Sequence, residues 1–225
     1  MATINIAIDG PAGAGKSTIA KAVAAKLGFI YIDTGAMYRA VGLGAVQRGI
    51  DSSDSEGVIS ILDELEITLK HTEQGQLIFL NGENVSEAIR MPEISVAASN
   101  VAVIPAVRLK LVELQRQLAK QADVIMDGRD IGTYVLPDAQ LKIFLTAAPE
   151  ARAKRRWLEL TEKGVTTTFE EVFNDMTYRD KNDSGREFAP LKPAEDSVLV
   201  DSTELTLEET VEHITAMVEE LRGAK

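Results

Sequence analysis

The sequence predicts an α/β fold built on a mostly parallel sheet, and three observations lead to that prediction. A glycine-rich loop at residues 10–17 lies between a short apolar segment at 3–9 and an amphipathic segment at 17–27. Further apolar strands along the chain are separated by helical segments rather than by tight turns. The pattern changes between residues 66 and 85, where alternating segments predict a small antiparallel insert.

The loop reads Gly-Pro-Ala-Gly-Ala-Gly-Lys-Ser and fits the phosphate-binding pattern G-x-x-x-x-G-K-[ST]. Its glycines let successive N–H groups point at one anion, and the following helix adds its free donors and the positive end of its dipole. Lys16 is expected to reach the β- and γ-phosphates, and the Ser17 hydroxyl is expected to bind Mg²⁺. A glycine-rich turn without a ligand is the alternative, which the flanking strand and helix disfavour. The predicted triphosphate-binding residues are Gly10, Pro11, Ala12, Gly13, Ala14, Gly15, Lys16, Ser17 and Thr18.

The next part of the chain predicts one more strand–helix pair and then the insert. Residues 29–32 predict a strand, and Thr34 is expected to cap a helix that runs to about residue 48. A polar loop and a short amphipathic helix are expected at 49–54 and 56–65. Alternating residues then predict an antiparallel meander, with strands at 66–70, 76–80 and 83–85 and turns at 73–75 and 81–82. Helical segments are expected at 86–89, 92–103 and 105–120.

The second half of the chain returns to strands that alternate with helices. Strands are expected at 124–127, 141–145 and 197–201, and helices at 150–163, 169–180 and 206–221. Residues 181–186 are polar and contain a glycine, which is typical of a mobile loop. This alternation favours a parallel sheet, whose ligands bind at the carboxyl ends of the strands.

The composition is that of a globular protein, with 45% apolar and 26% charged residues. The formal net charge of −11 disfavours a general nucleic-acid binder, so a phosphate site needs its own local positive cluster. No cysteine is present, which excludes disulfides and thiolate metal sites. Asp9 and Lys16 interrupt the N-terminal apolar segment, and the longest uncharged run, 94–107, is too short to span a bilayer. We therefore expect a soluble cytoplasmic protein that binds neither nucleic acid nor a membrane.

The predicted strand ends carry most of the candidate site residues. The strands end at Gly10, Asp33, Asp201 and the run Asp127-Gly128-Arg129-Asp130. In an acidic chain, arginines gathered near one crevice are suited to bidentate capture of phosphates, and this set comprises Arg39, Arg129, Arg155, Arg179 and Arg186. The alternative, a solvated surface arginine, is favoured for each of Arg152, Arg156 and Arg179 taken singly.

Two aspartates in this region are expected to have different roles. Asp127 ends an apolar strand and is expected to orient Mg²⁺ through water, with a turn or capping aspartate as the alternative. Asp130 lies beside Arg129, where a carboxylate repels phosphate unless it serves another group. Carboxylates accept hydrogen bonds from exocyclic amines such as N4 of cytosine, so Asp130 is a candidate base reader. His71 and His213 are isolated, and neither is assigned a role.

Five segments together resemble the bacterial cytidylate kinase family, and the resemblance extends from residue 3 to about residue 222. Asp-Thr-Gly-Ala-Met-Tyr-Arg at 33–39 and Asp-Gly-Arg-Asp-Ile-Gly-Thr at 127–133 are distinctive of this family, whereas the glycine loop at 8–17 alone is not. The segments Lys-Ile-Phe-Leu at 142–145 and Asp-Ser-Thr at 201–203 also match.

The resemblance implies a P-loop core with a five-stranded parallel sheet flanked by helices, an inserted region that binds the nucleoside monophosphate, and a short lid. The core is expected at 1–35, 104–150 and 187–225, within a single kinase unit that spans 1–225. The monophosphate-binding region is expected at 36–103, with the antiparallel insert at 62–90, and the lid at 151–186.

The resemblance also implies roles for individual residues. Arg39, Arg129 and Arg186 are implied to bind the CMP phosphate, and Ser99, Arg108 and Asp130 to recognise the cytosine. Asp183, with Arg179 nearby, is implied to bind the sugar, and Arg155 to lie near the transferred phosphoryl group. Thr34 keeps the hydroxyl that some relatives supply with serine. Ser17 is replaced by glycine in some members, which weakens its expected metal role. The residues expected to act directly on the reaction are Lys16, Arg129, Arg155 and Arg186.

The implied reaction transfers the γ-phosphoryl group of ATP to CMP, and also to dCMP, with Mg²⁺ as the cofactor and a monomer as the working form. A regulatory GTPase is disfavoured because the guanine-reading sequence N-K-x-D is absent. A P-loop kinase that acts on another nucleoside monophosphate or on another small acceptor remains the open alternative.

Overall fold

The computed structural model describes residues 3–72 and 75–223, which form two compact units. The P-loop unit comprises residues 3–30 and 123–223, and the insert unit comprises residues 31–72 and 75–122. The chain therefore leaves the P-loop unit after its first strand and helix and returns to it for the second half of the sequence.

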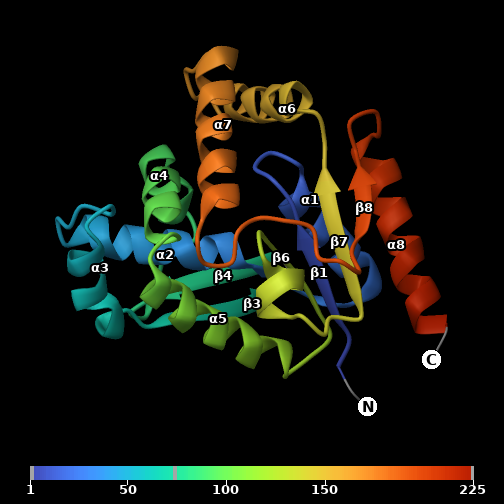
Figure 1. The fold of residues 1–225 in the computed structure, drawn as a ribbon, viewed down its shortest axis with the longest axis horizontal. Helices are drawn as coiled ribbons and strands as arrows, with labels where there is room; N and C mark the ends of the chain where they lie inside the picture. Colours follow the sequence, from blue (N-terminus) through green and yellow to red (C-terminus); the bar gives the residue numbers. More distant parts are fainter. Residues whose placement is uncertain (1–2, 73–74, 224–225) are drawn as a thin grey trace. The chain divides into compact units, whose positions relative to one another are not determined.

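A five-stranded parallel sheet is the framework of the fold, which confirms the α/β prediction (Figure 1). Its strand order is β2-β6-β1-β7-β8. In β1, Ile6, Ala7 and Ile8 have no exposed surface, as expected of a central strand covered on both faces. The strands are β1 Asn5–Asp9, β2 Ile30–Asp33, β6 Val124–Gly128, β7 Leu141–Thr146 and β8 Val198–Asp201.

Helices of the P-loop unit follow its strands, as the alternating pattern predicts. Figure 1 shows α8 alongside β8, and α6 and α7 beyond the carboxyl end of β7. A π-helical turn, η3, follows β6, and no element was predicted there. The helices of this unit are α1 Lys16–Leu27, α6 Pro149–Glu162, α7 Phe169–Gly185 and α8 Leu207–Gly223, and the π-helical turn is η3 Ile131–Val135.

The insert unit contains the predicted antiparallel meander, in the order β3-β4-β5. Leu69 of β3 pairs with Ile78 of β4, and part of the turn predicted at 73–75 lies outside the described residues. Met37, Val41 and Leu111 are buried in one apolar cluster that joins the helices to the meander. The elements are α2 Thr34–Gln47, α3 Ser55–Ile61, η1 Leu62–Glu64, β3 Ile67–Thr72, β4 Gly75–Leu80, β5 Glu83–Asn84, η2 Ala88–Arg90, α4 Pro92–Val101 and α5 Pro105–Ala119.

Asp33, not Thr34, caps α2, so the capping prediction was wrong by one residue. The Asp33 carboxylate accepts a hydrogen bond from the N–H of Ala36 at 2.9 Å, while Thr34 is already helical. Both residues suit an N-cap, and the choice falls to Asp33 because β2 extends through it and leaves it in an extended conformation.

The mobile loop predicted at 181–186 was also wrong for most of its length, because α7 continues to Gly185. The helix begins at a capping box in which Thr168 and Glu171 satisfy each other's backbone N–H groups. Near its other end, Asp183 forms an ion pair with Arg129 from the loop after β6, at 2.7 Å. Arg129, which is 54 residues away in the sequence, stabilises this last turn of α7. The polar residues of 181–186 alone therefore could not predict that the helix continues.

Within the described part of the chain, no single helix is long and apolar enough to cross a membrane. The pair α4 and α5 satisfies the length and composition of a span when taken together, but the two helices are bent by 100°. Both helices contribute buried side chains to the apolar cluster of the insert unit, among them Ile94, Val101 and Val107.

Gly10 occupies a position where β7 leaves no space for a side chain. Its φ is +150°, and a Cβ atom there would lie 1.9 Å from the carbonyl oxygen of Leu145. We expect Gly10→Ala to lower the free energy of unfolding by more than about 3 kcal/mol, because the loop backbone must move. Urea denaturation measures this loss. Gly28→Ala is the control, since Gly28 has φ +72° with no atom within 4 Å, and it should cost about 1–2 kcal/mol. Equal losses would show that backbone strain alone accounts for both variants.

The Asp183–Arg129 pair predicts a pH-dependent contribution to stability. Burial opposes ionisation of Asp183, but Arg129 and Arg186 outweigh it and hold the pKa of that carboxyl below its ordinary value. A carboxyl with a depressed folded pKa stabilises the fold above its unfolded pKa of about 4, and loses that contribution as the pH falls through the folded pKa. We expect Asp183→Asn to lower the free energy of unfolding by about 2 kcal/mol at pH 7 and by much less near pH 3.

Denaturation curves at several pH values test this expectation. Asp175→Asn is the matched control on the same helix. Asp175 is half exposed, and its ion pair with Arg179 is long, at 4.0 Å. The free energy of unfolding of this variant should therefore fall by less than about 0.5 kcal/mol at every pH. A difference for Asp183→Asn that does not shrink in acid would contradict the ion-pair explanation.

Candidate active site

The glycine-rich loop connects β1 to α1 as the motif requires. Gly15 adopts a left-handed conformation with φ 86° and serves as the N-cap of α1. Lys16 opens the helix, is only 5% exposed, and donates from Nζ to the carbonyl of Pro11 at 2.7 Å. Burial and the nearby guanidinium of Arg129 lower the pKa of Lys16 to about 7. An anionic ligand in the loop would favour the charged form of this lysine, so binding of an anion there would raise the pKa of Lys16 again.

Ser17 and Asp127 meet at the start of α1 and the end of β6. The Ser17 hydroxyl donates to Oδ2 of Asp127 at 2.9 Å. Across residues 3–72 and 75–223, no group of three or more His, Cys, Asp or Glu side chains is arranged to hold a metal ion. A hydroxyl and a carboxylate fit Mg²⁺, which commonly takes one or two protein oxygens and completes its shell with phosphates and water. The pair therefore suits a metal that arrives with a nucleotide.

Asp9, the last residue of β1, holds the loop that contains Asp130. Its two carboxylate oxygens accept hydrogen bonds from the N–H groups of Ile131 and Gly132, both at 2.7 Å. Burial raises the pKa of Asp9 to about 6, and these two hydrogen bonds oppose that rise. No site role was predicted for Asp9, although an acid that ends a buried strand requires hydrogen-bond partners there.

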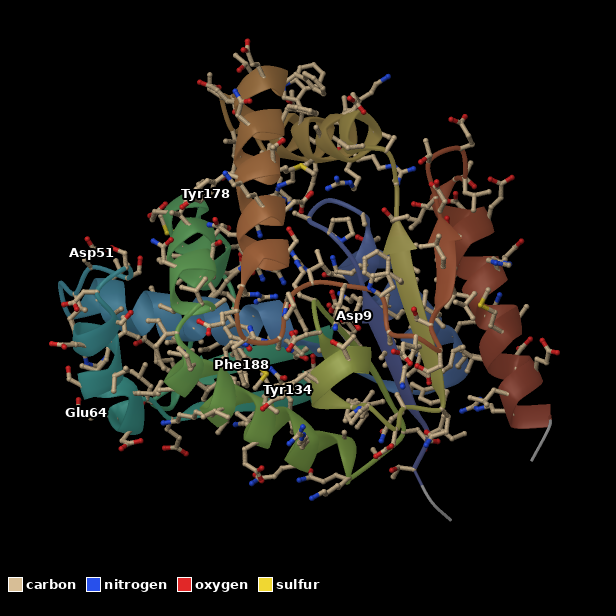
Figure 2. All side chains as sticks on the ribbon, in the orientation of Figure 1. Asp9, Asp51, Glu64, Tyr134, Tyr178 and Phe188 are labelled. Carbon is tan, nitrogen blue, oxygen red and sulfur yellow. The ribbon has the colours of Figure 1, made fainter. Side chains whose placement is uncertain are left out.

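The segment after α7 packs on the same loop. Figure 2 shows Tyr134 of η3 beside Phe188, and their ring centroids are 4.8 Å apart in an edge-to-face arrangement. Asp130 is 4% exposed and immediately precedes this turn. The candidate base reader is therefore buried in a loop that is fixed from two sides, by Asp9 and by the ring contact.

Arg129 and Arg186 meet at one carboxylate. Arg129 donates from Nε to Asp183 at 2.7 Å and from Nη1 to the carbonyl of Gly128 at 3.3 Å. Arg186 is 9% exposed, lies 3.9 Å from the same carboxylate, and donates from Nε to the Asp183 carbonyl. Arg179 lies one turn earlier on α7 and helps to lower the pKa of Asp183. The structure thus brings together three of the predicted acceptor-side arginines around Asp183.

Arg155 lies apart from that cluster, against the segment after β8. Its guanidinium donates to the hydroxyl of Ser202 at 3.1 Å and to the carbonyls of Ser202 and Thr203 at 2.5 and 3.4 Å. The expected position of this arginine beside a transferred phosphoryl group thus stays a prediction.

Arg152 was interpreted as a surface residue, and that interpretation was wrong. The side chain is buried, and it donates to carbonyl oxygens of Ala12 and Ala147 and to the carboxylate of Asp180. Several basic residues lie near Arg152 on α6, and the sequence pattern did not show which of them contacts the glycine-rich loop.

The insert unit holds the remaining predicted residues. Thr34 is buried in the first turn of α2, and Arg39 one turn later lies 3.9 Å from Asp33. Arg108 of α5 has no exposed surface; it donates to the carbonyl of Ala102 at 3.2 Å, and its guanidinium lies 5.6 Å from the ring centroid of Tyr38. Ser99 is half-buried on α4. Two of the predicted site arginines therefore lie in this unit, Arg39 partly exposed and Arg108 fully buried.

Sequence comparison relates nearly the whole chain to cytidylate kinases. The family model described as cytidylate kinase matches residues 6–220. A cytidylate kinase from Caldicellulosiruptor saccharolyticus is 54% identical over 223 residues, which cover 99% of each chain. A cytidylate kinase from a Geobacillus species is 51% identical over 220 residues, which cover 98% of each chain.

A solved structure supports the fold independently of close sequence similarity. An uncharacterised protein from Eubacterium ventriosum has a TM-score of 0.54 and 13% identity, and the match covers 96% of this chain and 99% of that one. At this identity the likeness concerns the fold alone. The family model, by contrast, spans nearly the whole sequence, and the curated relatives share about half of its residues. This chain belongs to the cytidylate kinase family.

Proposed function

We propose that this protein transfers the γ-phosphoryl group of ATP to CMP, and also to dCMP, giving ADP and CDP or dCDP. Membership of the family and full-length similarity to proteins named cytidylate kinase support this choice of acceptor. The observation that carries the proposal is the cationic cluster of Lys16, Arg129 and Arg186 in a chain whose net charge is −11. Such a cluster needs anionic ligands, and the glycine-rich loop beside it supplies the nucleotide site.

The donor triphosphate binds residues Gly10 to Thr18 in this proposal. Backbone N–H groups of the loop and the start of α1 surround the phosphates, and the Lys16 ammonium leaves the Pro11 carbonyl for the β- and γ-phosphates. Ser17 and Asp127 hold Mg²⁺, which supplies charge neutralisation to the phosphates when it is bound.

The acceptor phosphate binds Arg39, Arg129 and Arg186. Asp183 keeps two of these guanidinium groups ordered before CMP arrives, so less conformational freedom is lost on binding. Asp183, with Arg179, then binds the sugar. Thr34 contributes its hydroxyl beside Arg39 at the start of α2.

Cytosine is read by Ser99, Arg108 and Asp130. Arg108 is suited to a fixed contact, because its guanidinium is fully buried over Tyr38 and tethered to the Ala102 carbonyl. Asp130 accepts from the 4-amino group of cytosine. A uracil carbonyl would face that carboxylate with a lone pair, and unpaired buried polar groups are costly.

The chemistry requires positioning and charge neutralisation rather than a general base. The attacking phosphate oxygen is largely ionised at pH 7 because the second pKa of a phosphate monoester is about 6. Lys16, Arg129 and Arg186 offset the charge that spreads over the transferred group, and Arg155 is proposed to join them when both nucleotides are bound. Water must be excluded, since it would otherwise compete as the acceptor.

A substrate panel tests the proposal. Purified protein with Mg-ATP is offered CMP, dCMP, UMP, AMP, GTP and shikimate, and ADP release is measured. We expect turnover with CMP and dCMP well above the others. Lys16→Ala should retain less than about a tenth of that turnover, a loss of more than about 1.4 kcal/mol in transition-state stabilisation. Preferred turnover of shikimate or AMP would instead establish a P-loop kinase for another acceptor.

Base choice gives a second prediction. Wild type should prefer CMP over UMP by on the order of a hundredfold or more in kcat/KM. Asp130→Ala should lose most of its activity with CMP and much less with UMP, so that the ratio collapses. Asp130→Asn should shift the ratio further towards UMP, because an amide can donate to the uracil carbonyl. The measurement is kcat/KM for both nucleotides in all three proteins, and a wild-type ratio in Asp130→Ala would assign discrimination to Ser99 and Arg108.

A further inference from the structure

Two side chains from α6 and α7 engage both backbone groups of one residue in the glycine-rich loop. The N–H of Ala12 donates to Oδ1 of Asp180 at 2.9 Å, and the carbonyl of Ala12 accepts from Nη1 of Arg152 at 2.7 Å. The same Nη1 lies 2.6 Å from Oδ2 of Asp180, which closes the arrangement. Arg152 is further fixed by its Nε, which donates to the carbonyl of Ala147 at 3.0 Å.

An apolar contact reinforces this attachment. Ala12 belongs to a buried cluster with Ala153 of α6 and Val172 and Met176 of α7. A Cβ atom at Gly13 would lie 2.5 Å from Cε of Met176, so the helix approaches the loop as closely as glycine allows. Figure 1 shows both helices on the side of the P-loop unit where this loop lies. The α6–α7 pair is therefore seated directly on the loop.

The charges at this point need explanation. Asp180 places a carboxylate against the backbone of a loop whose ligand is a triphosphate, and two anions in such a position repel each other. Arg152 is 6% exposed, and its side chain pairs with that carboxylate. Because Asp180 occupies the N–H of Ala12 while Arg152 offsets its charge, the loop is held in shape without leaving a net negative group beside the phosphates.

We propose that Arg152 and Asp180 are a positioning pair for ATP binding, in which Arg152 neutralises Asp180 and Asp180 fixes the backbone at Ala12. The inference rests on the proposed function only in taking ATP as the ligand of the loop. It assigns neither residue to the reacting atoms. It also gives the two residues unequal effects: loss of Arg152 leaves an uncompensated carboxylate at the phosphate site, whereas loss of the Asp180 charge does not.

The chain offers a matched control on α6. Arg156 pairs with Glu159 at 2.8 Å, three residues apart on the same helix, and both side chains are a third or more exposed. Neither belongs to the candidate site, so Arg156→Met removes an arginine ion pair from α6 without touching Ala12.

The test compares Arg152→Met, Asp180→Asn, the double variant and Arg156→Met. Calorimetric titration with the ATP analogue AMP-PNP and Mg²⁺, in the absence of CMP, measures donor affinity. We expect Arg152→Met to weaken that affinity at least tenfold, Asp180→Asn to weaken it less, and the double variant to bind more tightly than Arg152→Met. Arg156→Met should match wild type. Steady-state assays should show the same order in the KM for ATP, with the KM for CMP changed less than threefold.

If Arg152 acts by neutralising Asp180, the double variant should recover part of the ATP affinity that Arg152→Met loses. If the two residues only hold the loop in shape, the losses of affinity in the single variants should instead add in the double variant. Thermal unfolding of each protein identifies variants that do not fold. If Arg152→Met is unfolded, Arg152→Lys replaces it, and its single cation should retain affinity closer to wild type than Arg152→Gln does. Unchanged affinity in Arg152→Met, or a double variant weaker than Arg152→Met, overturns the inference. Absence of CMP-dependent turnover in wild type would overturn the proposed function and leave this result standing.

Discussion

Buried charge must be paired, and this requirement shapes the edge of the sheet where the glycine-rich loop lies. The loop and its surroundings gather cations for an anionic ligand, and four carboxylates hold that region in order around them. Asp9 accepts from two backbone N–H groups, Asp127 accepts from Ser17, Asp183 pairs with Arg129, and Asp180 pairs with Arg152. Every one of these contacts joins two parts of the chain that are far apart in the sequence.

Local patterns were sufficient for the framework and insufficient for these contacts. Apolar runs located the strands because most residues of β1 and β6 are buried and β7 is apolar except for Lys142 and Thr146. The loop motif placed Lys16 and Ser17 at the start of α1. The last turn of α7 and the burial of Arg152 depend on partners 54 and 140 residues away. No spacing rule encodes such pairs. The assignments of Ser99 and Arg108 to cytosine came from family resemblance alone, whereas that of Asp130 was also argued from its carboxylate beside Arg129. All three stay predictions.

The two units differ in how they hold their arginines. In the P-loop unit Arg129 and Arg186 share a carboxylate, which a second anion can replace as their partner. In the insert unit Arg108 is fully buried over an aromatic ring and fixed by a backbone carbonyl. The first arrangement suits capture of a phosphate, and the second suits recognition that depends on a rigid donor.

The two hydrogen bonds from Asp9 to Ile131 and Gly132 have a consequence for protein engineering. Asp9 directly precedes the loop proposed for ATP, and the N–H groups it accepts from directly follow the residue proposed to read the base. The site proposed for ATP and the site proposed for the base are therefore linked through Asp9. A library that seeks a new acceptor can vary position 130, but it should keep position 9 constant, since a change at position 9 would alter the sites proposed for both substrates.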